Sequence, residues 1–491
     1  MIDELRDHLV AAGYHVDAVL DRLGEMGQAG LQRNSTIPAH DALAGDRSPL
    51  ATLIRLFPLN CAVPVEDAAR ALPLEAACAA GLTIIERGKV RATADLRPYG
   101  FPTPRGQWDG WVAADHTPGL DQDRSPTRPD YVLGISPAST TLAQLTIDDQ
   151  VGSALDLGTG CGVQSLHLST HAAHVTATDV NPRCLGHAKL TAALNRIDVD
   201  FREGSLYEPV ADARFDLIVT NPPYVISPPA TAGRLVYREA GLPGDDLVRQ
   251  IVTGSVNHLN PGGTCQVLAN WAILDQPWQE RLAGWAPPGA DLWVIERERL
   301  DPYTYIEMWL ADAGLADDPR WLASYREWLD YFKDLGIRGV GMGWITVINA
   351  QRHQPEITLE SWPHEVHQPV GPAIAAHRHA VTNSRLPDDR LLATYWTLRS
   401  DIVQETLGEP GAADPQHVVL RQTTGMKRAL AVDTALGGVL GACDGALPLG
   451  AVIDAVARLL GEEPAGLSAA LLPTIRTAVC EDYLRPTLAS R

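Results

Sequence analysis

The stretch "ALDLGTGCGVQSLHL", from Ala154 to Leu168, joins the end of an apolar strand pattern to the start of a helical pattern. Gly158, Gly160 and Gly162 lie in the turn between them. Glycines at such a turn let the backbone approach a ligand closely, and the first turn of the following helix has amides without partners within the helix. This strand, turn and helix predict a ligand-binding turn in an α/β fold.

The same alternation extends along the chain on both sides of this stretch. From about Tyr131 to Ala350, seven apolar strand candidates alternate with helical stretches such as "PRCLGHAKLTAALN". The strand candidates are "SALDLG", "HVTATDV", "VDFREG", "FDLIVT", "TCQVLANW", "DLWVIER" and "GWITVIN". Alternation of strand and helix is typical of a doubly wound, mostly parallel sheet. We therefore expect an α/β, Rossmann-like domain around a seven-stranded sheet.

An acidic residue, Asp179, follows the glycine turn by about twenty residues, at the end of the next strand candidate. Its carboxylate can accept hydrogen bonds from ribose hydroxyls, so the two features indicate a nucleoside site. The spacing G-x-G-x-G is that of S-adenosylmethionine methyltransferases, whereas dinucleotide loops prefer G-x-G-x-x-G. A nicotinamide dehydrogenase and a turn without a catalytic role remain as alternatives. The predicted cofactor-binding residues are Asp156, Gly158, Thr159, Gly160, Gly162, Asp179, Val180, Ser205, Leu206 and Asn221.

A second stretch, "FDLIVTNPPYVISPP" from Phe215 to Pro229, runs from an alternating strand pattern straight into two prolines. Prolines remove backbone donors and end a central strand, a local cost that tends to occur at working sites. In a sheet of this class, ligands lie outside the carboxyl ends of the strands, and this is where Asn221 follows the fourth strand candidate. The predicted catalytic residues are Asn221, Pro222, Pro223 and Tyr224.

These four residues suit a substrate with a planar NH2 group. The side-chain oxygen of Asn221 and the carbonyl of Pro222 can accept its two protons, while Pro223 stiffens the turn and Tyr224 offers a ring for stacking. Such a nitrogen is a poor nucleophile because its lone pair is delocalised, and two acceptors would turn that lone pair toward a sulfonium methyl. We expect direct in-line methyl transfer through positioning and charge stabilisation, without a strong general base. The alternative interpretation is a proline-rich loop that only ends the strand.

At these residues the chain resembles a known family. "DLGTGCG", "TDVNP", "FDLIVTNPPYV" and "YREAGLPGDDLVRQIV" are similar to the catalytic domain of the HemK/PrmC group, which methylates a glutamine amide nitrogen in translation release factors. The "NPPYVISPP" form is especially similar to the eukaryotic branch of that group. The resemblance runs from Val132 to Ile273 and implies a class I methyltransferase domain with S-adenosylmethionine as its cofactor. The NPPY motif is shared with enzymes that methylate the amino groups of adenine or guanine.

The chain departs from this family at two places. Before the first strand candidate it has "LGISPASTTLA", where the bacterial release-factor enzymes carry an arginine and an acid. At the end of the third strand candidate an aspartate commonly contacts the adenine amino group, and here we expect that contact from Ser205 or the Leu206 amide. Tyr237, Arg238 and Glu239 lie where a loop after NPPY would cover the substrate, and they are equally compatible with a structural role.

The flanking segments differ in pattern from the central domain. Residues 1–105 contain three helical stretches and "LTIIERGKVRATADL", which alternates like a hairpin turning at "ERGK", so we expect a helical, winged-helix-like domain. Residues 106–130 are rich in proline, glycine and aspartate and are expected to form a linker or lid. The methyltransferase domain is expected over residues 131–350. Residues 351–491 are expected to form a C-terminal domain, again with a winged-helix-like pattern.

The composition limits the class of protein. With 491 residues, of which 45% are hydrophobic, the chain exceeds what one core usually serves. It has no apolar run as long as a membrane span and no basic-then-apolar leader, so we expect a cytoplasmic protein without a membrane partner. A formal charge of -20 disfavours a general nucleic-acid coat but leaves a local basic groove open. The sequence does not predict the oligomeric state.

Two further clusters of side chains have alternative interpretations. The stretch "HEVHQPVGPAIAAHRH" lacks a cysteine or acidic pattern of metal-binding spacing, so we expect solvent-facing loop histidines rather than a metal site. These histidines are His364, His367, His377 and His379. The stretch "WLASYREWLDYF" repeats aromatic residues at helical spacing, which favours a helix packed on the sheet or in a lid over a base-stacking surface.

Together these patterns predict an enzyme. We expect S-adenosylmethionine-dependent N-methyl transfer to a planar amide or amino nitrogen of a macromolecule, with a protein glutamine, as in a translation factor, slightly favoured. An RNA or DNA nucleobase, at adenine N6 or guanine N2, is the alternative acceptor, supported by the winged-helix pattern. A small-molecule acceptor and a regulatory module that binds S-adenosylmethionine without catalysis are further alternatives. Intact Asn221 and Tyr224 argue against the regulatory module.

Overall fold

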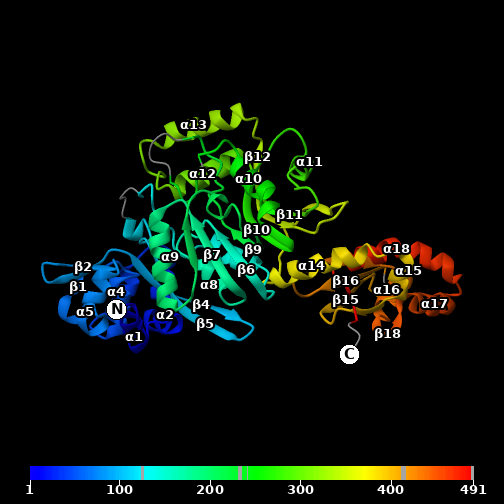
Figure 1. Cartoon of the computed structure of the whole chain (residues 1–491), viewed down its shortest axis with the longest axis horizontal. Coiled ribbons are helices and arrows are strands. Elements are labelled where there is room, and N and C mark those ends of the chain that lie inside the picture. Colours follow the sequence, from blue (N-terminus) through cyan, green and yellow to red (C-terminus); the bar gives the residue numbers. More distant parts are fainter. Residues whose placement is uncertain (123–126, 230–234, 240, 411–415, 488–491) are drawn as a thin grey trace. The chain divides into compact units, whose positions relative to one another are not determined.

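The computed structural model divides into two compact units, which are described separately (Figure 1). The first unit comprises residues 1–143 and 150–362, and the second comprises residues 144–149 and 363–491. The residues whose structure is described are 1–122, 127–229, 235–239, 241–410 and 416–487.

The first part of unit one is helical, with a small three-stranded sheet in the order β1-β3-β2. The predicted hairpin is confirmed, because β2 and β3 pair antiparallel on either side of Arg87 and Gly88. Leu5, Leu9 and Phe57 are completely buried in the core of this part. The winged-helix assignment stays a prediction. The elements are α1 (Ile2–Ala11), α2 (Val16–Gln32), α3 (Ile37–Ala42), α4 (Pro49–Leu56), β1 (Val63–Pro64), α5 (Val65–Ala71), α6 (Leu74–Ala79), β2 (Thr83–Glu86) and β3 (Lys89–Ala92).

Residues expected to begin a linker form a strand instead. β4 (Asp95–Thr103) and β5 (Gly106–Ala114) pair as a long antiparallel hairpin. Trp111 of β5 is buried, and its indole nitrogen donates a hydrogen bond to the backbone carbonyl of Tyr14. The side chain of Asn195 bonds both the amide and the carbonyl of Trp111, at 3.0 and 2.7 Å. These contacts order β5 despite its glycines, so the linker expected over residues 106–130 does not begin at residue 106.

The centre of unit one is an eight-stranded sheet in the order β13-β11-β12-β10-β9-β6-β7-β8. All seven predicted strands are present, and β13 is an additional strand at the edge. Because β13 pairs with β11, the sheet extends past the boundary expected at residue 350. The strands are β6 (Val151–Leu157), β7 (Ala172–Asp179), β8 (Asp200–Glu203), β9 (Phe215–Thr220), β10 (Leu259–Ile273), β11 (Asp291–Leu300), β12 (Gly339–Ile348) and β13 (Ile357–Ser361).

The pairing of these strands confirms the predicted fold class, an α/β domain with a mostly parallel sheet. Strands β8, β7, β6, β9 and β10 run parallel to one another, whereas β12 pairs antiparallel with both β10 and β11. Helices or short 3-10 turns precede the first strand of this sheet or connect its strands. They are α7 (Pro137–Leu145), α8 (Val163–Leu168), α9 (Pro182–Asn195), α10 (Asp246–Ser255) and α11 (Trp278–Ala283), with turns η1 (Leu120–Gln122), η2 (Glu208–Val210) and η3 (Val256–His258).

Two helices, α12 (Pro302–Asp312) and α13 (Trp321–Asp334), are inserted between β11 and β12. The aromatic repeat of α13 is a packing surface, as the helical interpretation predicted. Trp328 and Phe332 are buried against Tyr305 of α12 and Val225, which follows the NPPY residues. The hydroxyl of Tyr305 also accepts a hydrogen bond from the amide of Ile226, at 3.0 Å. The insertion is therefore anchored to the chain that follows β9.

Unit two contains helices around two three-stranded sheets, in the orders β18-β14-β19 and β15-β16-β17. Trp396, Val439 and Tyr483 are buried in its core. The stretch "QHVVLRQTT" contains β16, and the winged-helix assignment stays a prediction. The elements are α14 (Gly371–Ser384), α15 (Asp388–Ala393), β14 (Tyr395–Leu398), β15 (Ile402–Leu407), β16 (His417–Gln422), β17 (Ala429–Val432), α16 (Thr434–Gly441), β18 (Asp444–Pro448), α17 (Leu449–Leu460), α18 (Pro464–Cys480) and β19 (Leu484–Pro486).

The four histidines of the C-terminal stretch were expected to lie in a loop, but only two of them do. His364 and His367 are exposed outside regular structure, whereas His377 and His379 lie on α14. The reason is that the residues after Val370 continue as a helix through the alanine-rich part of the stretch. Among the described residues, no group of three or more His, Cys, Asp or Glu side chains is arranged to hold a metal ion.

None of the helices in the described part of the chain is long and apolar enough to span a membrane.

Candidate active site

Three neighbouring strands end at the same level and bring the predicted site residues together. Leu157 of β6 pairs with Thr178 of β7 on one side and with Thr220 of β9 on the other. The residues that follow these strands therefore leave the sheet side by side at its carboxyl edge. Asp179 in turn pairs with Glu203 of β8, which brings the loop after β8 to the same edge.

A cavity of about 310 Å³ lies at this edge. That volume is at the lower end of the range usual for small-molecule and cofactor sites. Ten of the residues predicted for cofactor binding or catalysis line it, together with residues outside the predicted set. The ten are Gly158, Thr159, Gly160, Asp179, Val180, Ser205, Leu206, Asn221, Pro222 and Pro223.

The first two glycines of the motif have backbone conformations that other residues rarely adopt. Gly158 has φ of 75° and Gly160 has φ of 56°. No described atom lies within 4 Å of the position that a Cβ would take at either residue. The amides of Gly158 and Thr159 donate to the carbonyl of Thr178, which ties the loop to β7. The loop thus turns sharply and leaves open space beside it, so that a ligand can approach its backbone.

The third glycine and the first aspartate of the motif have structural positions and do not line the cavity. Gly162 is the N-cap of α8 with φ of 85°, and a Cβ there would lie 3.2 Å from Cα of Ala188 on α9. Asp156 is buried beneath the loop, where its Oδ2 accepts hydrogen bonds from the hydroxyls of Thr159 and Ser165, at 2.6 and 2.7 Å. Burial raises the pKa of Asp156 to about 6, against the opposing effect of these hydrogen bonds.

Asp179 lies between the glycine loop and the cavity. Its Oδ2 accepts a hydrogen bond from the amide of Gly160, at 2.9 Å, and its Oδ1 accepts one from the amide of Asn181, at 2.8 Å. Burial raises the pKa of Asp179, and these amides oppose that rise. A carboxylate oxygen has more than one acceptor site, so both oxygens keep capacity for a ligand hydroxyl. Val180, which follows, is 58% exposed and lines the cavity as an apolar surface.

The loop after β8 contributes a strained residue to the cavity. Leu206 has φ of 48°, which is uncommon for any residue other than glycine, asparagine or aspartate. Its side chain packs partly against the core of the sheet, and Ser205 precedes it on the cavity wall. Such strain tends to persist only where the surroundings impose it, and it is found at ligand sites.

Asn221 lines the cavity and carries an unsatisfied hydrogen-bond acceptor. Its Oδ1 is buried and has no hydrogen-bond partner among the described residues. The preceding Thr220 is held firmly, because its hydroxyl donates to the carbonyl of Leu157 at 2.7 Å. A buried polar atom without a partner costs free energy, commonly 1–3 kcal/mol, unless a ligand or water satisfies it. The position of Asn221 therefore suits a ligand that donates a hydrogen bond.

Tyr224, unlike the other three predicted catalytic residues, does not line this smaller cavity. It forms an isolated antiparallel bridge with Glu239 and lines a second, larger cavity of about 1440 Å³ rather than the first. Burial, with a smaller contribution from the charge of Asp312, raises the pKa of Tyr224 to about 12. The ring is thus placed to contact whatever fills the larger cavity, and the stacking role expected for it remains a prediction.

The two cavities share part of their walls. Asn221, Tyr131, Tyr237 and Glu239 line both of them. Tyr237 and Glu239 belong to the predicted covering loop, whereas Tyr131 was missed because the only signals before β6 were a proline-rich pattern and the lack of charges. The rings of Tyr131 and Tyr237 meet edge to face with centroids 5.4 Å apart.

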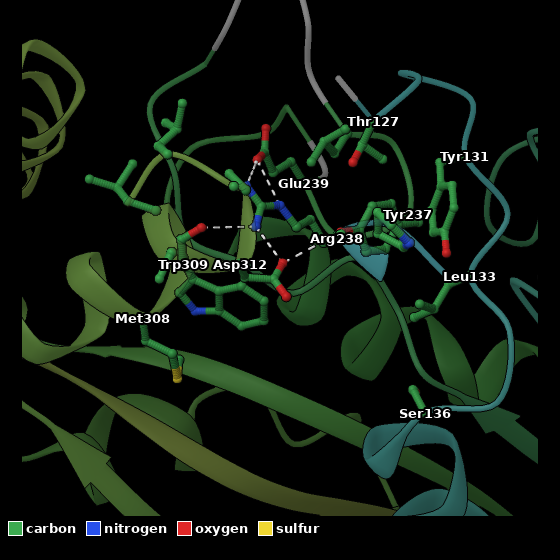
Figure 2. Close-up of a pocket in the computed structure, with 18 of the residues that line it drawn as sticks. Thr127, Tyr131, Leu133, Ser136, Tyr237, Arg238, Glu239, Met308, Trp309 and Asp312 are labelled. Atoms are coloured by element: carbon green, nitrogen blue, oxygen red, sulfur yellow. Dashed lines mark hydrogen bonds and ion pairs between the residues drawn. The ribbon is translucent and has the colours of Figure 1, made fainter. Parts of the chain in front are cut away.

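Helix α12 also supplies cavity residues that the sequence did not indicate. Met308, Trp309 and Asp312 line the larger cavity, around Arg238 of the covering loop (Figure 2). Met308 and Trp309 resemble the packing residues nearby, and Asp312 resembles any helix-surface carboxylate, so no local signal marks them as cavity residues. Only the position of α12 after β11 brings these residues to the cavity.

Comparison with known proteins assigns the part of the chain that forms this site. Residues 134–278 match the methyltransferase small domain. This match confirms the resemblance predicted from Val132 to Ile273. Residues 11–93 match a domain of unknown function, DUF7059.

Three curated relatives are similar to about a quarter of this chain. A release factor glutamine methyltransferase of Xylella fastidiosa is 37% identical over 138 residues, 26% of this chain and 48% of that protein. A ribosomal RNA small subunit methyltransferase C of Erwinia tasmaniensis is 32% identical over 128 residues, 26% of this chain and 33% of that protein. A ribosomal protein uL3 glutamine methyltransferase of Bradyrhizobium diazoefficiens is 31% identical over 143 residues, 26% of this chain and 45% of that protein. The chain thus spans half or less of the length of these relatives.

Proposed function

We propose that this protein is an S-adenosylmethionine-dependent N-methyltransferase that acts on a planar amide or amino nitrogen of a macromolecule. The observation that carries the proposal is the buried, unpartnered Oδ1 of Asn221, at the junction of a cofactor-sized cavity and a larger one. An NH2 group in the larger cavity would satisfy this oxygen. The match to the methyltransferase small domain supports the same reaction class.

The residues of the smaller cavity fit the cofactor. Gly158 and Gly160 leave open space where a side chain would lie, and Asp179 keeps acceptor capacity for ribose hydroxyls. Val180 offers an apolar surface for a base, and the loop of Ser205 and Leu206 closes the wall beside it. S-adenosylmethionine, when bound, supplies an electrophilic methyl group on a sulfonium sulfur.

The role proposed for the chain is to orient the acceptor nitrogen. Oδ1 of Asn221 and the carbonyl of Pro222 each accept one hydrogen bond from the NH2 group, so that the lone pair of its nitrogen points away from both acceptors. The same two oxygens stabilise the positive charge that develops on nitrogen during transfer, because they are fixed before the reaction begins. Pro222 and Pro223 limit the freedom of this turn. As the nitrogen gains its bond to carbon, the carbon–sulfur bond would break with its electron pair left on sulfur, and the excess proton would then pass to water because the methylated nitrogen is acidic.

A protein glutamine is the favoured acceptor. Two of the three relatives described above are named for glutamine methylation, of a release factor and of a ribosomal protein. The second candidate is an RNA nucleobase, which the name of the ribosomal RNA relative supports. Both acceptors present a planar NH2 group, so the Asn221 geometry serves either one. We propose in addition that the acceptor is a component of the translation machinery and that methylation takes place in the cytoplasm.

Transfer of a labelled methyl group tests the proposal and separates the two acceptors. The purified protein is incubated with labelled S-adenosylmethionine and an extract of cells that lack its gene, and the product is treated with protease or nuclease. We expect macromolecular label that resists nuclease and is lost with protease. Label that is lost only with nuclease would replace glutamine by a nucleobase. An extract that gains no label, although the protein binds the cofactor, would contradict the proposed reaction.

A further inference from the structure

The larger cavity has an acidic wall. Its described lining residues include seven carboxylates and three arginines, so their formal charge is -4, or -3 when Asp115 is counted with its partner Arg183 at 2.6 Å. The carboxylates come from the β4–β5 hairpin and the segment after it, from the covering loop, and from the region of α12 and α13. They are Asp95, Asp115, Glu239, Asp312, Asp317, Asp318 and Glu327.

Each of the three arginines is already paired with a carboxylate of the same wall. Arg97 lies 2.6 Å from Asp95, and Arg320 lies 2.8 Å from Asp318. Figure 2 shows the third, Arg238, with its guanidinium held between Glu239 at 3.0 Å and Asp312 at 2.7 Å. Arg238 is only 6% exposed, and its guanidinium also lies over the ring of Trp309. In the described part of the wall, each arginine is therefore already paired with a carboxylate of the protein.

An acidic cavity discriminates between classes of macromolecule. A cleft lined by one sign of charge focuses its field inward and raises the local concentration of ligands of the opposite sign. Nucleic-acid binding depends on lysine and arginine that neutralise phosphates, and the described wall offers three arginines that are all engaged. The formal charge of -20 on the whole chain adds to the repulsion of a polyanion.

We infer that the larger cavity binds a polypeptide segment that carries lysine or arginine close to the residue being methylated. The volume of about 1440 Å³ exceeds that of a usual small-molecule pocket and accommodates several residues of a peptide. Asn221, Tyr131 and Tyr237 line both cavities, so a segment bound there presents one side chain at Asn221. This inference rests on the proposed function, and it specifies in addition that the acceptor segment is positively charged.

Binding of matched peptides tests the inference without requiring turnover. One fluorescent pool has a central glutamine among glycine and serine, with two arginines at varied flanking positions. The second pool has citrulline, the uncharged analogue of arginine, at the same positions, and a single-stranded RNA of similar length is the third probe. Affinities for the full-length protein are measured by anisotropy with S-adenosylhomocysteine present, at about 50 and 300 mM salt.

Two double variants locate the effect on the cavity wall. Asp317→Asn with Glu327→Gln removes two exposed carboxylates of the wall, one before α13 and one on it. Asp330→Asn with Asp334→Asn removes two exposed carboxylates of α13 that do not line the cavity. The two variants change the net charge equally, so a difference between them reports position rather than total charge.

We expect the arginine pool to bind the parent protein about tenfold more tightly than the citrulline pool at low salt, with a smaller ratio at high salt. The cavity variant should lower this ratio at least about threefold, and the control variant should preserve it. Equal binding of the two pools, equal effects of the two variants, or tighter binding of RNA than of the arginine pool would each overturn the inference. Arginine-dependent binding without methyl transfer in a parallel assay would support it and contradict the proposed reaction instead.

Discussion

Two aspartates hold the glycine loop at the residue scale, and they do so in different ways. Asp156 accepts hydrogen bonds from two hydroxyl groups beneath the loop, whereas Asp179 accepts them from two backbone amides and lines the cavity. Burial raises the pKa of both carboxyls, because the charged form loses its hydration. The buried charge of Asp156 therefore lowers the stability of the fold. The buried charge of Asp179 lies at the cavity, where a bound ligand can stabilise it with further hydrogen bonds.

A pH-dependent contribution to stability follows for Asp156. Its folded pKa, about 6, lies above the value near 3.9 expected for the unfolded chain, so the folded state binds more protons between these values. The contribution favours folding at low pH and is lost as pH rises through 6, by about 1 kcal/mol between pH 5 and 7.5. Asp156→Asn, which keeps an acceptor oxygen but no charge, should remove this loss. Urea unfolding of the parent and variant at both pH values measures it, and parallel pH profiles would contradict the assignment.

A side chain at Gly160 should weaken cofactor binding in addition to destabilising the fold. Gly160→Val places a side chain beside the cavity and forces a positive φ, which costs about 1–2 kcal/mol in a residue with a Cβ. Gly45→Val is the matched control, because Gly45 also has positive φ and no described atom within 4 Å of its Cβ position. We expect similar destabilisation of the two variants, but a loss of cofactor affinity of at least about tenfold only for Gly160→Val, measured by calorimetry. Equal affinities would contradict the proposed cofactor position.

The glycine motif also shows where prediction from residues stops. Spacing identified Gly158 and Gly160 as members of a cavity wall, but Gly162 has the same appearance in the sequence and instead allows α8 to pack closely on α9. Likewise Asn221 lines the predicted site, whereas Tyr224, three residues later, lines the larger cavity only. Such differences arise from backbone direction and from neighbours distant in sequence, which local patterns do not contain.

At the scale of elements, the covering loop connects the chain that carries the NPPY residues to the inserted helices α12 and α13. Arg238 joins them, since it pairs with Glu239 beside it, with Asp312 of α12, and with the carbonyl of Trp309. The carbonyl of Arg238 accepts the amide proton of Val225, four residues after Asn221. Arg238 thus links α12 to the chain that carries the NPPY residues.

The ion pair between Arg238 and Asp312 should limit local opening of α12. Asp312→Asn removes the charge of the partly exposed partner and leaves Glu239 to balance Arg238. We expect amide hydrogen exchange in residues 302–312 to accelerate about threefold, the scale of a partly exposed ion pair. Asp330→Asn, which loses only an exposed pair with Lys333, is the control. Unchanged exchange in α12, or equal acceleration by the control, would show that the pair does not hold the helix.

Prediction of elements succeeded where periodicity was regular and failed where glycine, proline or charge interrupted it. The seven strands of the sheet were identified from apolar runs between helical patterns. β5 was missed because its glycines and aspartate resemble a linker, although Asn195 and Tyr14 fix it through hydrogen bonds. β13 was missed because none of its side chains is fully buried, as expected for a short edge strand.

For the molecule as a whole, the sequence indicated the reaction better than the partner. Charge and fold class can be read from composition and periodicity, but the division into units depends on contacts between distant residues. Gln144–Asp149 belong to the second compact unit although they precede β6. The acidic wall could not be foreseen for the same reason, because its carboxylates come from segments more than two hundred residues apart.

The central claim is that Asn221 orients an acceptor nitrogen for methyl transfer, and one pair of measurements tests it most directly. Transfer of labelled methyl to the acceptor found in the extract is compared between the parent and Asn221→Ala, with cofactor affinity measured by calorimetry on the same samples. We predict nearly unchanged affinity and at least about a hundredfold slower transfer, the scale for losing a preorganised polar group. Asn221→Asp, which keeps the acceptor, should retain part of the activity. Transfer at the parent rate by folded Asn221→Ala would contradict the claim and leave NPPY as a stiff turn that ends β9.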